Sequence, residues 1–486
     1  MTGTGQTYGR RINELAADDP ERVALVFAPR DGPVERYSMA ELDSRSDQVA
    51  RALAARGVGI DDRVGLEMAN SPALLVSVLA SWKLGASPVP LRWDLPPWER
   101  NRLLDVLGAR LVISGDDPAL ADTGPSSPAE PLPDVLGHHA HGICSSGSTG
   151  SPKVIMAERP AFYDPAASAP LAALWGTVAS PQVVLVPAPL YHTNGFATLL
   201  HLLAGDSLVL LERFDAGRVL DLIEAHRVTS FTATPTMLAR IARTPGVTER
   251  DLSSIDWVLQ GGAVIAQSLV RTWIELVGPT HLIMAYGMTE ALGLTGIRGD
   301  EWLERPGSVG RGIRGTEVRV LGPDSTPVPT GEIGEIYLRM PGGASYSYIG
   351  GAARLPTTDD GFSTGGDLGW LDDEGFLYIA DRRVDMIVSG GANVYPAEVE
   401  SALIDHPAVV DVVVIGLRDD EWGRRVHALV QPADPATPPS LADIVEFAKL
   451  RLAPYKVPKS IEVVASMPRT EATKINRSAL VTERGG

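Results

Sequence analysis

The sequence predicts an α/β fold in which parallel β-sheets are covered by helices on both faces. Short apolar segments such as residues 64–68, 183–186 and 208–211 alternate with segments of helical length. Strands that alternate with helices in this way are typical of parallel sheets, because each return to the sheet needs a crossover. Residues 321–339 depart from the alternation and predict a β-rich segment. A chain of 486 residues is long enough for roughly two to four domains.

Start and stop signals place the individual elements. Ser38 and Glu41 have the spacing of a capping box, and the helix that they open is expected to end at Gly57. The elements expected after it are a strand at 64–68, a helix at 72–84, an extended segment at 88–91, a helix at 98–107 and a strand at 111–113. Farther along, a helix at 216–226, a strand at 230–235 and, near the end, a helix through residues 398–403 are expected.

Composition and charge argue against several classes of partner. The net charge of −17, from 60 acidic and 43 basic residues, disfavours nucleic acid and anionic membranes. No apolar stretch reaches about 18 residues, so we expect no membrane span and a cytoplasmic protein. Cys144 is the only cysteine, which leaves no disulfide framework and fits a reducing compartment. His138, His139 and His141 have no acidic or cysteine partner at ligand spacing, so a metal cluster is not expected there.

A run of hydroxyl residues and glycines between two apolar segments predicts a phosphate-binding loop. Its hydroxyls, backbone N–H groups and final lysine could converge on one anion. The run consists of Ser145, Ser146, Gly147, Ser148, Thr149, Gly150, Ser151, Pro152 and Lys153. A simple P-loop NTPase is disfavoured, because Pro152 separates the glycine from Lys153 and no hydroxyl follows. A flexible surface linker is the alternative, but the apolar flanks favour a loop held between two strands.

Three further strands are expected to end in residues suited to ligand binding. Residues 183–186 lead into a turn that contains His192, at the strand end where open α/β sheets bind ligands. The next candidate is a strand that ends at Gly261 and Gly262, where a missing Cβ would let a flat ring lie against the backbone. Thr289 and Glu290 follow an apolar segment and could hold Mg²⁺ and phosphate oxygens together. A tight turn and a helix cap are the alternatives for the last two.

These motifs closely resemble the adenylate-forming superfamily, which includes acyl-CoA synthetases, firefly luciferase and peptide-synthetase adenylation domains. Residues 145–153 resemble its nucleotide-binding signature, and residues 286–290 match its tyrosine-glycine-x-threonine-glutamate motif residue for residue. Residues 364–370, 375–382 and 468–477 resemble later motifs, so the likeness covers nearly the whole chain. It implies an enzyme that makes an acyl-adenylate from a carboxylate and ATP and releases pyrophosphate.

The resemblance also implies a role for each motif. Glu290 would bind Mg²⁺, Thr289 would contact the phosphates, and Asp367 with Arg382 would bind the ribose. Lys474 would bridge the attacking carboxylate and the α-phosphate. His192 would lie beside the carboxylate. The other ATP-binding residues implied are Ser145, Ser146, Gly147, Ser148, Thr149, Gly150, Lys153, Gly261, Gly262, Ala263, Tyr286 and Ile379. The other substrate-pocket residues implied are Asn194, Gly195, Phe196, Gly261, Gly287 and Met288.

Two domains joined by a hinge are implied as well. Residues 1–382 would bind ATP and substrate, residues 383–385 would form the hinge, and residues 386–486 would form a small, mobile α+β domain that carries Lys474. Rotation of this domain would open a channel for a thiol, and thioester formation with CoA is the leading expectation. The CoA would be contacted by Gly390, Gly391, Trp422 and Arg424.

The acceptor and the assembly state stay open in the sequence. The later segments look most similar to bacterial fatty-acid and bile-acid CoA ligases. An amide ligase, a carrier-loading enzyme and an ATP-dependent diazotase that activates nitrite toward an arylamine are the alternatives. A nucleotide-binding regulator without catalysis is a further one, against which Glu290 and Lys474 argue. The lack of Asp and Glu in residues 187–196 disfavours an α-amino acid substrate. Both a monomer and a homodimer are compatible with the chain.

Three positions depart from the family pattern. Val154 follows Lys153 where a glycine is usual, and Val384 stands at the hinge where Asp or Lys is common. Thr473 replaces the glycine that usually precedes Lys474. A hinge needs only to tolerate a change of φ and ψ, but a β-branched residue such as Val384 could slow the motion.

Overall fold

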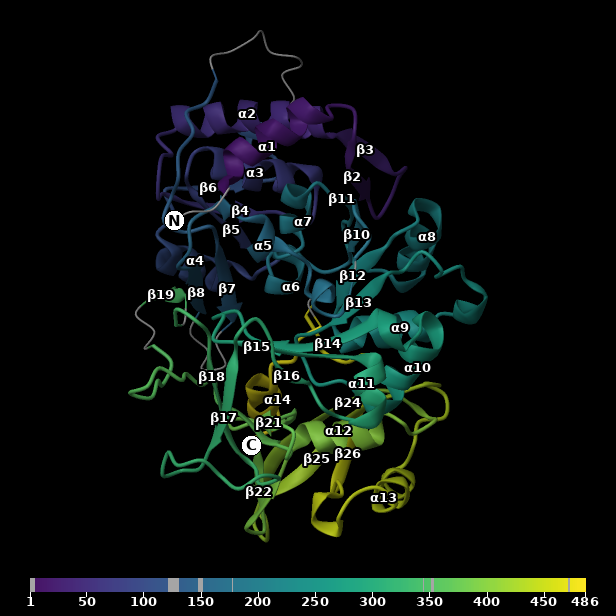
Figure 1. The fold of residues 1–486 in the computed structure, drawn as a ribbon. Helices are drawn as coiled ribbons and strands as arrows, with labels where there is room; N and C mark the ends of the chain where they lie inside the picture. Colours follow the sequence, from purple (N-terminus) through teal and green to yellow (C-terminus); the bar gives the residue numbers. More distant parts are fainter. Residues whose placement is uncertain are drawn as a thin grey trace.

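A nine-stranded sheet forms the centre of the larger part of the molecule (Figure 1). The computed structural model describes residues 5–120, 131–146, 152–176, 178–343, 345–350, 354–470 and 473–486. The sheet has six parallel strands, β2 (Val23–Ala28), β10 (Val183–Val186), β11 (Ser207–Leu211), β12 (Ser230–Ala233), β13 (Trp257–Gln260) and β14 (Leu282–Gly287). Antiparallel strands complete both edges, with β3 (Glu35–Ser38) on one side and β15 (Leu294–Arg298) and β16 (Arg311–Gly312) on the other.

Helices cover both faces of this sheet, as the alternation predicts. Leu25 and Leu208 point into a core shared with α1 (Tyr8–Asp18), α2 (Met39–Ala55), α3 (Pro72–Lys83) and α7 (Leu199–Ala204). Their sequence neighbours Val26 and Val209 point to the opposite side. There they pack in a second core with α8 (Ala216–His226), α9 (Pro235–Ala242) and α10 (Gln267–Val277). Successive strand residues therefore alternate between two buried faces, which is why these strands read as continuous apolar runs.

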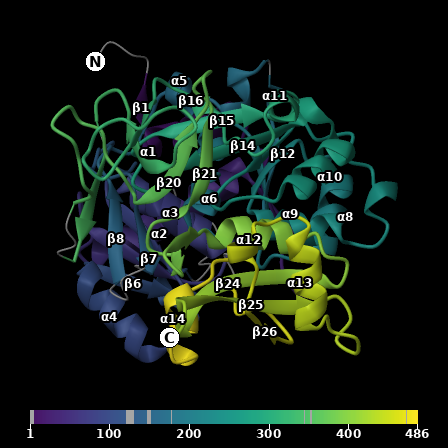
Figure 2. The ribbon, with the colours of Figure 1, turned by 90° about the horizontal axis from the view of Figure 1, so that it is seen from below.

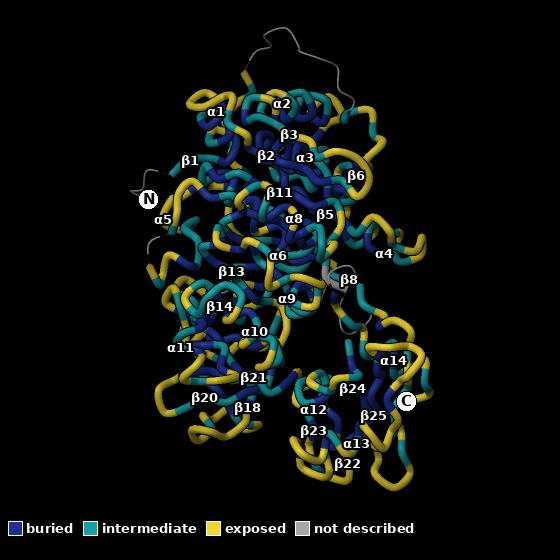
Figure 3. The backbone as a smooth tube through the Cα atoms, turned by 90° about the vertical axis from the view of Figure 1, so that its right-hand side faces the viewer, coloured by how far each residue is buried: buried dark blue, intermediate teal, exposed yellow. Residues whose placement is uncertain are grey.

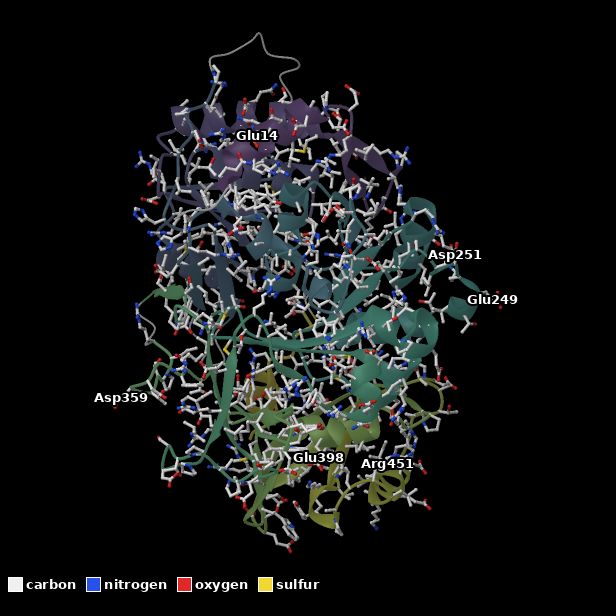
Figure 4. All side chains as sticks on the ribbon, in the orientation of Figure 1. Glu14, Glu249, Asp251, Asp359, Glu398 and Arg451 are labelled. Carbon is white, nitrogen blue, oxygen red and sulfur yellow. The ribbon has the colours of Figure 1, made fainter. Side chains whose placement is uncertain are left out.

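A smaller parallel sheet extends the N-terminal part. It consists of β4 (Arg63–Glu67), β5 (Ser87–Leu91) and β6 (Leu111–Ser114), and α4 (Pro97–Leu107) follows β5. The capping box at Ser38 is present in full, since the Ser38 hydroxyl accepts from the Glu41 N–H and the Glu41 carboxylate accepts from the Ser38 N–H. The acidic excess includes surface residues, and Glu249, Asp251 and Asp359 project at the periphery in Figure 4.

Two antiparallel sheets carry the predicted phosphate loop and the β-rich segment. Strands β7 (Gly142–Ser146) and β8 (Pro152–Ala157) pair in antiparallel fashion, and β19 (Tyr346–Ile349) pairs with β8. The loop is therefore held between two strands, as expected, while Gly147, Ser148, Thr149, Gly150 and Ser151 lie outside the described residues. A four-stranded antiparallel sheet contains β17 (Glu317–Leu321), β18 (Gly334–Arg339), β20 (Asp367–Leu371) and β21 (Leu377–Arg382).

The C-terminal residues form a small α+β unit with its own core, which is visible below the large sheet in Figures 1 and 2. Its main sheet contains β24 (Val409–Asp419), β25 (Gly423–Pro432) and β26 (Ser460–Val463). The hairpin β22 (Ile387–Ser389) and β23 (Ala392–Val394) and the helices α12 (Pro396–Leu403), α13 (Leu441–Lys449) and α14 (Arg477–Glu483) pack around it. Figure 3 shows buried backbone in this unit as well as in the larger one. None of the helices in the described ranges is long and apolar enough to cross a membrane.

Candidate active site

The carboxyl ends of the parallel strands bring together residues that lie far apart in the sequence. Thr193 follows β10 and Thr289 follows β14, and their hydroxyl oxygens are 2.8 Å apart. The side-chain nitrogen of Asn194 lies 3.5 Å from the carbonyl oxygen of Gly261, at the end of β13. Because parallel strands end at one edge of their sheet, the edge itself creates this group of polar side chains.

Gly262 allows a close approach at this edge. Its φ is +89°, and a Cβ added there would stand 3.1 Å from the side-chain nitrogen of Asn194. Both the left-handed backbone and the limited space therefore favour glycine. Gly262 and Ala263 are exposed, so a planar ligand has direct access to this stretch of backbone.

Lys153, Glu290 and Tyr348 form a compact polar group beside the phosphate loop. The Lys153 ammonium donates to Oε1 of Glu290 and to the Tyr348 hydroxyl, both at 3.0 Å. The Tyr348 hydroxyl in turn donates to Oε1 of Glu290 at 2.7 Å. Glu290 is only 9% exposed, so its carboxylate needs these partners. A buried carboxylate next to the Thr289 hydroxyl is the kind of ligand that Mg²⁺ accepts together with nucleotide oxygens.

Asp367 and Arg382 face each other across the ladder between β20 and β21. Nε of Arg382 donates to Oδ1 of Asp367 at 3.2 Å, and the Tyr286 hydroxyl donates to Oδ2 at 2.8 Å. Burial, followed by the charge of Asp367, raises the pKa of Tyr286 well above its usual value, so the hydroxyl keeps its proton and remains a donor. Ile379 lies in the same strand as Arg382. This pair presents a carboxylate that can accept from two neighbouring hydroxyl groups, as a ribose offers.

Lys474 reaches this cleft from the small domain. Partial loss of water around the Lys474 ammonium lowers its pKa, and the charge of Arg382 lowers it further while Glu290 acts in the opposite direction. Burial, followed by the charges of Lys474 and Arg92, lowers the pKa of His192 to about 3. Lys474 therefore lies within electrostatic range of Glu290, Arg382 and His192, although its side chain stays accessible to solvent. His192 is a neutral imidazole at physiological pH.

Several predicted site residues make contacts that packing alone explains. Phe196 is 3% exposed and lies in the N-terminal core, with its ring 6.1 Å from Trp82 and 4.6 Å from His141. A Cβ at Gly195 would stand 2.2 Å from the Pro189 carbonyl oxygen, so this glycine is needed for the turn itself. Gly287 has little free space next to Leu294.

Met288 and Trp422 also have protein partners. The Met288 sulfur lies 2.8 Å from where a Cβ on Gly365 would stand. Trp422 packs over Gly390, where an added Cβ would lie 2.7 Å from the indole, and the Lys459 ammonium is 5.0 Å from the ring centroid. Trp422 keeps 37% of its surface exposed. Burial raises the pKa of the Cys144 thiol to about 12, so the thiol keeps its proton near neutral pH.

Sequence reasoning missed three residues of the site region. Tyr348 reaches Lys153 and Glu290 because β19 pairs with β8, and no spacing in the sequence reveals that register. The hydroxyl of Thr234 lies 2.8 Å from that of Thr473, across the two parts of the chain.

Asn70 is 5% exposed and connects the ends of two strands. Its side chain donates to the carbonyls of Ala188 and Leu211 and accepts from the Leu190 N–H. An asparagine after an apolar strand was the only available signal for Asn70.

Comparison with known proteins supports the expected likeness to adenylate-forming enzymes over nearly the full chain. The AMP-binding enzyme family matches residues 12–348, and the AMP-binding enzyme C-terminal domain matches residues 398–474. A feruloyl-CoA synthase from Amycolatopsis sp is 34% identical, over 90% of this chain and 91% of that protein. A long-chain-fatty-acid–CoA ligase from Mycobacterium tuberculosis is 31% identical, over 98% of each chain.

Solved structures agree with these relatives. The o-succinylbenzoate CoA synthetase of Bacillus subtilis in complex with its acyl-adenylate intermediate is 30% identical, with a TM-score of 0.80 and 98% of each chain covered. The same enzyme in complex with ATP and magnesium ion gives a TM-score of 0.81 at 30% identity, covering 98% of this chain and 100% of that one. By these matches, this chain belongs to the family of AMP-binding, adenylate-forming enzymes.

Proposed function

We propose that this protein activates a carboxylate other than an α-amino acid with ATP, releases pyrophosphate, and transfers the acyl group to CoA. The observation that carries the proposal is the position of Lys474. It follows Thr473, whose hydroxyl lies 2.8 Å from that of Thr234 in the larger part, and it is within electrostatic range of Glu290 and His192. The named relatives support the CoA acceptor, since their names are those of a CoA synthase, a CoA ligase and a CoA synthetase. They also support the carboxylate class, because feruloyl, fatty-acyl and succinylbenzoyl groups are not α-amino acids.

The residues of the cleft suit the triphosphate and its metal. Glu290 and Thr289 would hold Mg²⁺ and the phosphates. The hydrogen bond between the hydroxyls of Thr193 and Thr289 would fix the orientation of the Thr289 side chain. Mg²⁺ would there neutralise phosphate charge as the leaving pyrophosphate develops. Lys153 is already paired with Glu290 and would exchange that carboxylate for phosphate oxygens. Asp367 and Arg382 would bind the ribose, and Tyr286 would keep Asp367 in place by its hydrogen bond.

Lys474 and His192 would orient the attacking carboxylate. The Lys474 ammonium offers a charge to both the carboxylate and the α-phosphate, which lowers their mutual repulsion. Neutral His192 can donate one hydrogen bond without competing with Lys474 for the negative charge. Catalysis by this group rests on positioning and electrostatic stabilisation, and no side chain has to gain or lose a proton.

The second half-reaction requires the small domain to move. We place the boundary at residues 383–385, because the core clusters that contain residues after 386 contain none before it. Val384 is 72% exposed, so a rotation there displaces no packed side chain. A cavity of about 220 Å³ lies between the two parts and is lined by Arg213, Arg240 and Arg469 among others. Arg213 and Arg240 at this cavity suit an anionic acceptor such as CoA, with Gly390, Gly391, Trp422 and Arg424 as further candidate contacts.

A pyrophosphate-release screen tests this function. Fatty, aryl and steroid carboxylates and nitrite would be supplied to the purified protein, each with and without CoA. The proposal predicts turnover with at least one carboxylate and a CoA-dependent thioester product. Turnover that requires an amine and no CoA would replace the thioester step by amide formation or, with nitrite, by diazotisation. We place the protein in the cytoplasm, in keeping with its single cysteine, and a homodimer is compatible with the proposal.

A further inference from the structure

The residue before Lys474 has an unusual backbone conformation. Thr473 has a φ of +62°, in the left-handed region that β-branched residues rarely occupy. It is 9% exposed. Its N–H donates to the Thr470 carbonyl at 2.7 Å, and the N–H of Lys474 donates to the Thr470 hydroxyl at 3.2 Å. A glycine would adopt this turn at lower cost than a threonine.

The Thr473 side chain contacts the larger domain. Its hydroxyl oxygen lies 2.8 Å from that of Thr234, at hydrogen-bond distance. Thr234 follows β12 and caps α9, where its hydroxyl accepts from the Met237 N–H. Thr234 also lies beside Gly262, at the sheet edge where the nucleotide is proposed to bind. Its methyl carbon is 3.9 Å from where a Cβ on Gly262 would stand. The bond therefore joins the Lys474 turn to the wall of the cleft.

The backbone of Thr473 is tied to the small domain. Nη1 of Arg469 donates to the Thr473 carbonyl at 3.0 Å. The Arg469 guanidinium also makes a two-point contact with the carboxylate of Asp411 in β24, at 2.6 and 2.7 Å. Thr473 thus links a rigid strand of the small domain to the large one, and Lys474 is the next residue in the chain.

We propose that Thr473 is a positioning residue that latches the two domains in the arrangement for adenylation. Its hydroxyl bond to Thr234 keeps Lys474 in the cleft, and its left-handed backbone directs the following side chain. The inference rests on the proposed function, because it assigns Lys474 to the first half-reaction. The bond must break before the small domain can rotate. The latch therefore favours adenylate formation and delays transfer to the thiol.

The test compares the two half-reactions in rapid-quench measurements on Thr473→Ala, Thr473→Ser and wild type. Thr473→Ala keeps the unfavourable backbone and loses the bond, so adenylate formation is expected to fall about 5-fold, the effect of one hydrogen bond. Thioester formation from preformed adenylate should stay unchanged or become faster. Thr473→Ser keeps the hydroxyl and should restore both rates. Thr482→Ala, which removes an exposed hydroxyl that donates to the Ser478 carbonyl within α14, serves as the matched control.

A double-variant cycle isolates the bond itself. If Thr234→Ala and Thr473→Ala act through one contact, the double variant should lose no more than the larger single effect. Equal loss in both half-reactions, or wild-type adenylation by Thr473→Ala, would overturn the latch. Neither outcome would touch the proposed function, which fails instead if Lys474→Ala forms adenylate at the wild-type rate.

Discussion

The Lys153 ammonium and Oε1 of Glu290 are 3.0 Å apart, and the Tyr348 hydroxyl contacts both. The residue proposed to bind Mg²⁺ is thus held by the residue proposed to bind phosphate. Phosphate binding to Lys153 and Mg²⁺ binding to Glu290 would each break this ion pair. The binding of ATP should therefore favour the binding of Mg²⁺, and the reverse.

Replacement of Glu290 by Gln tests the metal site. The amide keeps the shape of the side chain and removes its charge, so pyrophosphate release should fall about 100-fold and require more Mg²⁺. A Mg²⁺ titration of the initial rate measures both effects. Glu317→Gln is the matched control, because Glu317 forms an exposed ion pair with Arg339 outside the cleft. An unchanged Mg²⁺ requirement in Glu290→Gln would remove Glu290 from the metal site.

Replacement of Asp367 by Asn tests the ribose site. Loss of a charged hydrogen bond to the ribose should raise KM for ATP about 10-fold. The same change should raise KM for 2′-deoxy-ATP much less, since that nucleotide lacks one of the two hydroxyls. Steady-state rates with both nucleotides give the comparison. Asp360→Asn, at an exposed partner of Arg319, should leave both KM values unchanged. Equal increases for the two nucleotides would count against ribose recognition.

The pH dependence of adenylation tests the state of His192. Its pKa is lowered to about 3, so the imidazole is neutral throughout pH 5 to 8. The rate should therefore show no inflection near pH 6.5 that depends on this residue. His192→Asn should lower the rate and leave the shape of the profile unchanged. An inflection in the wild type that disappears in His192→Asn would show that His192 titrates in the working range.

Asp381 is expected to make stability depend on pH. Burial raises the pKa of Asp381 to about 6, although hydrogen bonds from the N–H groups of Ala397 and Arg382 and the charge of Arg477 lower it. The charge of Glu400 acts in the same direction as burial. Between about pH 4 and 6 the folded state then holds this proton more tightly than the unfolded state. Its contribution to stability is present in full below pH 4 and is lost as pH rises to 6. The shift corresponds to roughly 3 kcal/mol.

Asp381→Asn should remove that contribution. Apparent Tm at pH 4.5 and 6.5 would be compared for the variant, the wild type and Asp359→Asn, a substitution at an exposed position as the control. The variant should lose less Tm between the two pH values than the wild type does. An identical change in all three proteins would show that Asp381 keeps an ordinary pKa.

Local signals predicted several elements well where a capping or stop residue marks their ends. The helix expected at 216–226 is α8 (Ala216–His226), which begins at the Asp215 cap and ends where Arg227 turns left-handed. The parallel sheet and its two buried faces followed from the alternation alone. The antiparallel pairing of β7, β8 and β19 did not, because a short apolar strand gives no sign of its direction.

The sequence predicted the motif residues of the candidate site. It did not predict the contacts between residues of different motifs. Lys153, Glu290, Asp367 and Lys474 stand in recognisable runs, so their residue types and order pointed to the chemistry. Tyr348 stands in no such run, and its role depends on strand register. Thr473 was noted only as a departure from glycine. Its partner Thr234 is 239 positions away, and the bond between them depends on how the small domain sits on the large one.

Adenylate formation by Lys474→Ala tests the central claim most directly. Pyrophosphate release and ATP binding would be measured on the wild type, the variant and Lys449→Ala, a change of an exposed lysine in the same domain. The account predicts at least a 100-fold loss of pyrophosphate release in Lys474→Ala alone, with ATP affinity within about 3-fold of wild type. Wild-type pyrophosphate release by Lys474→Ala would contradict it.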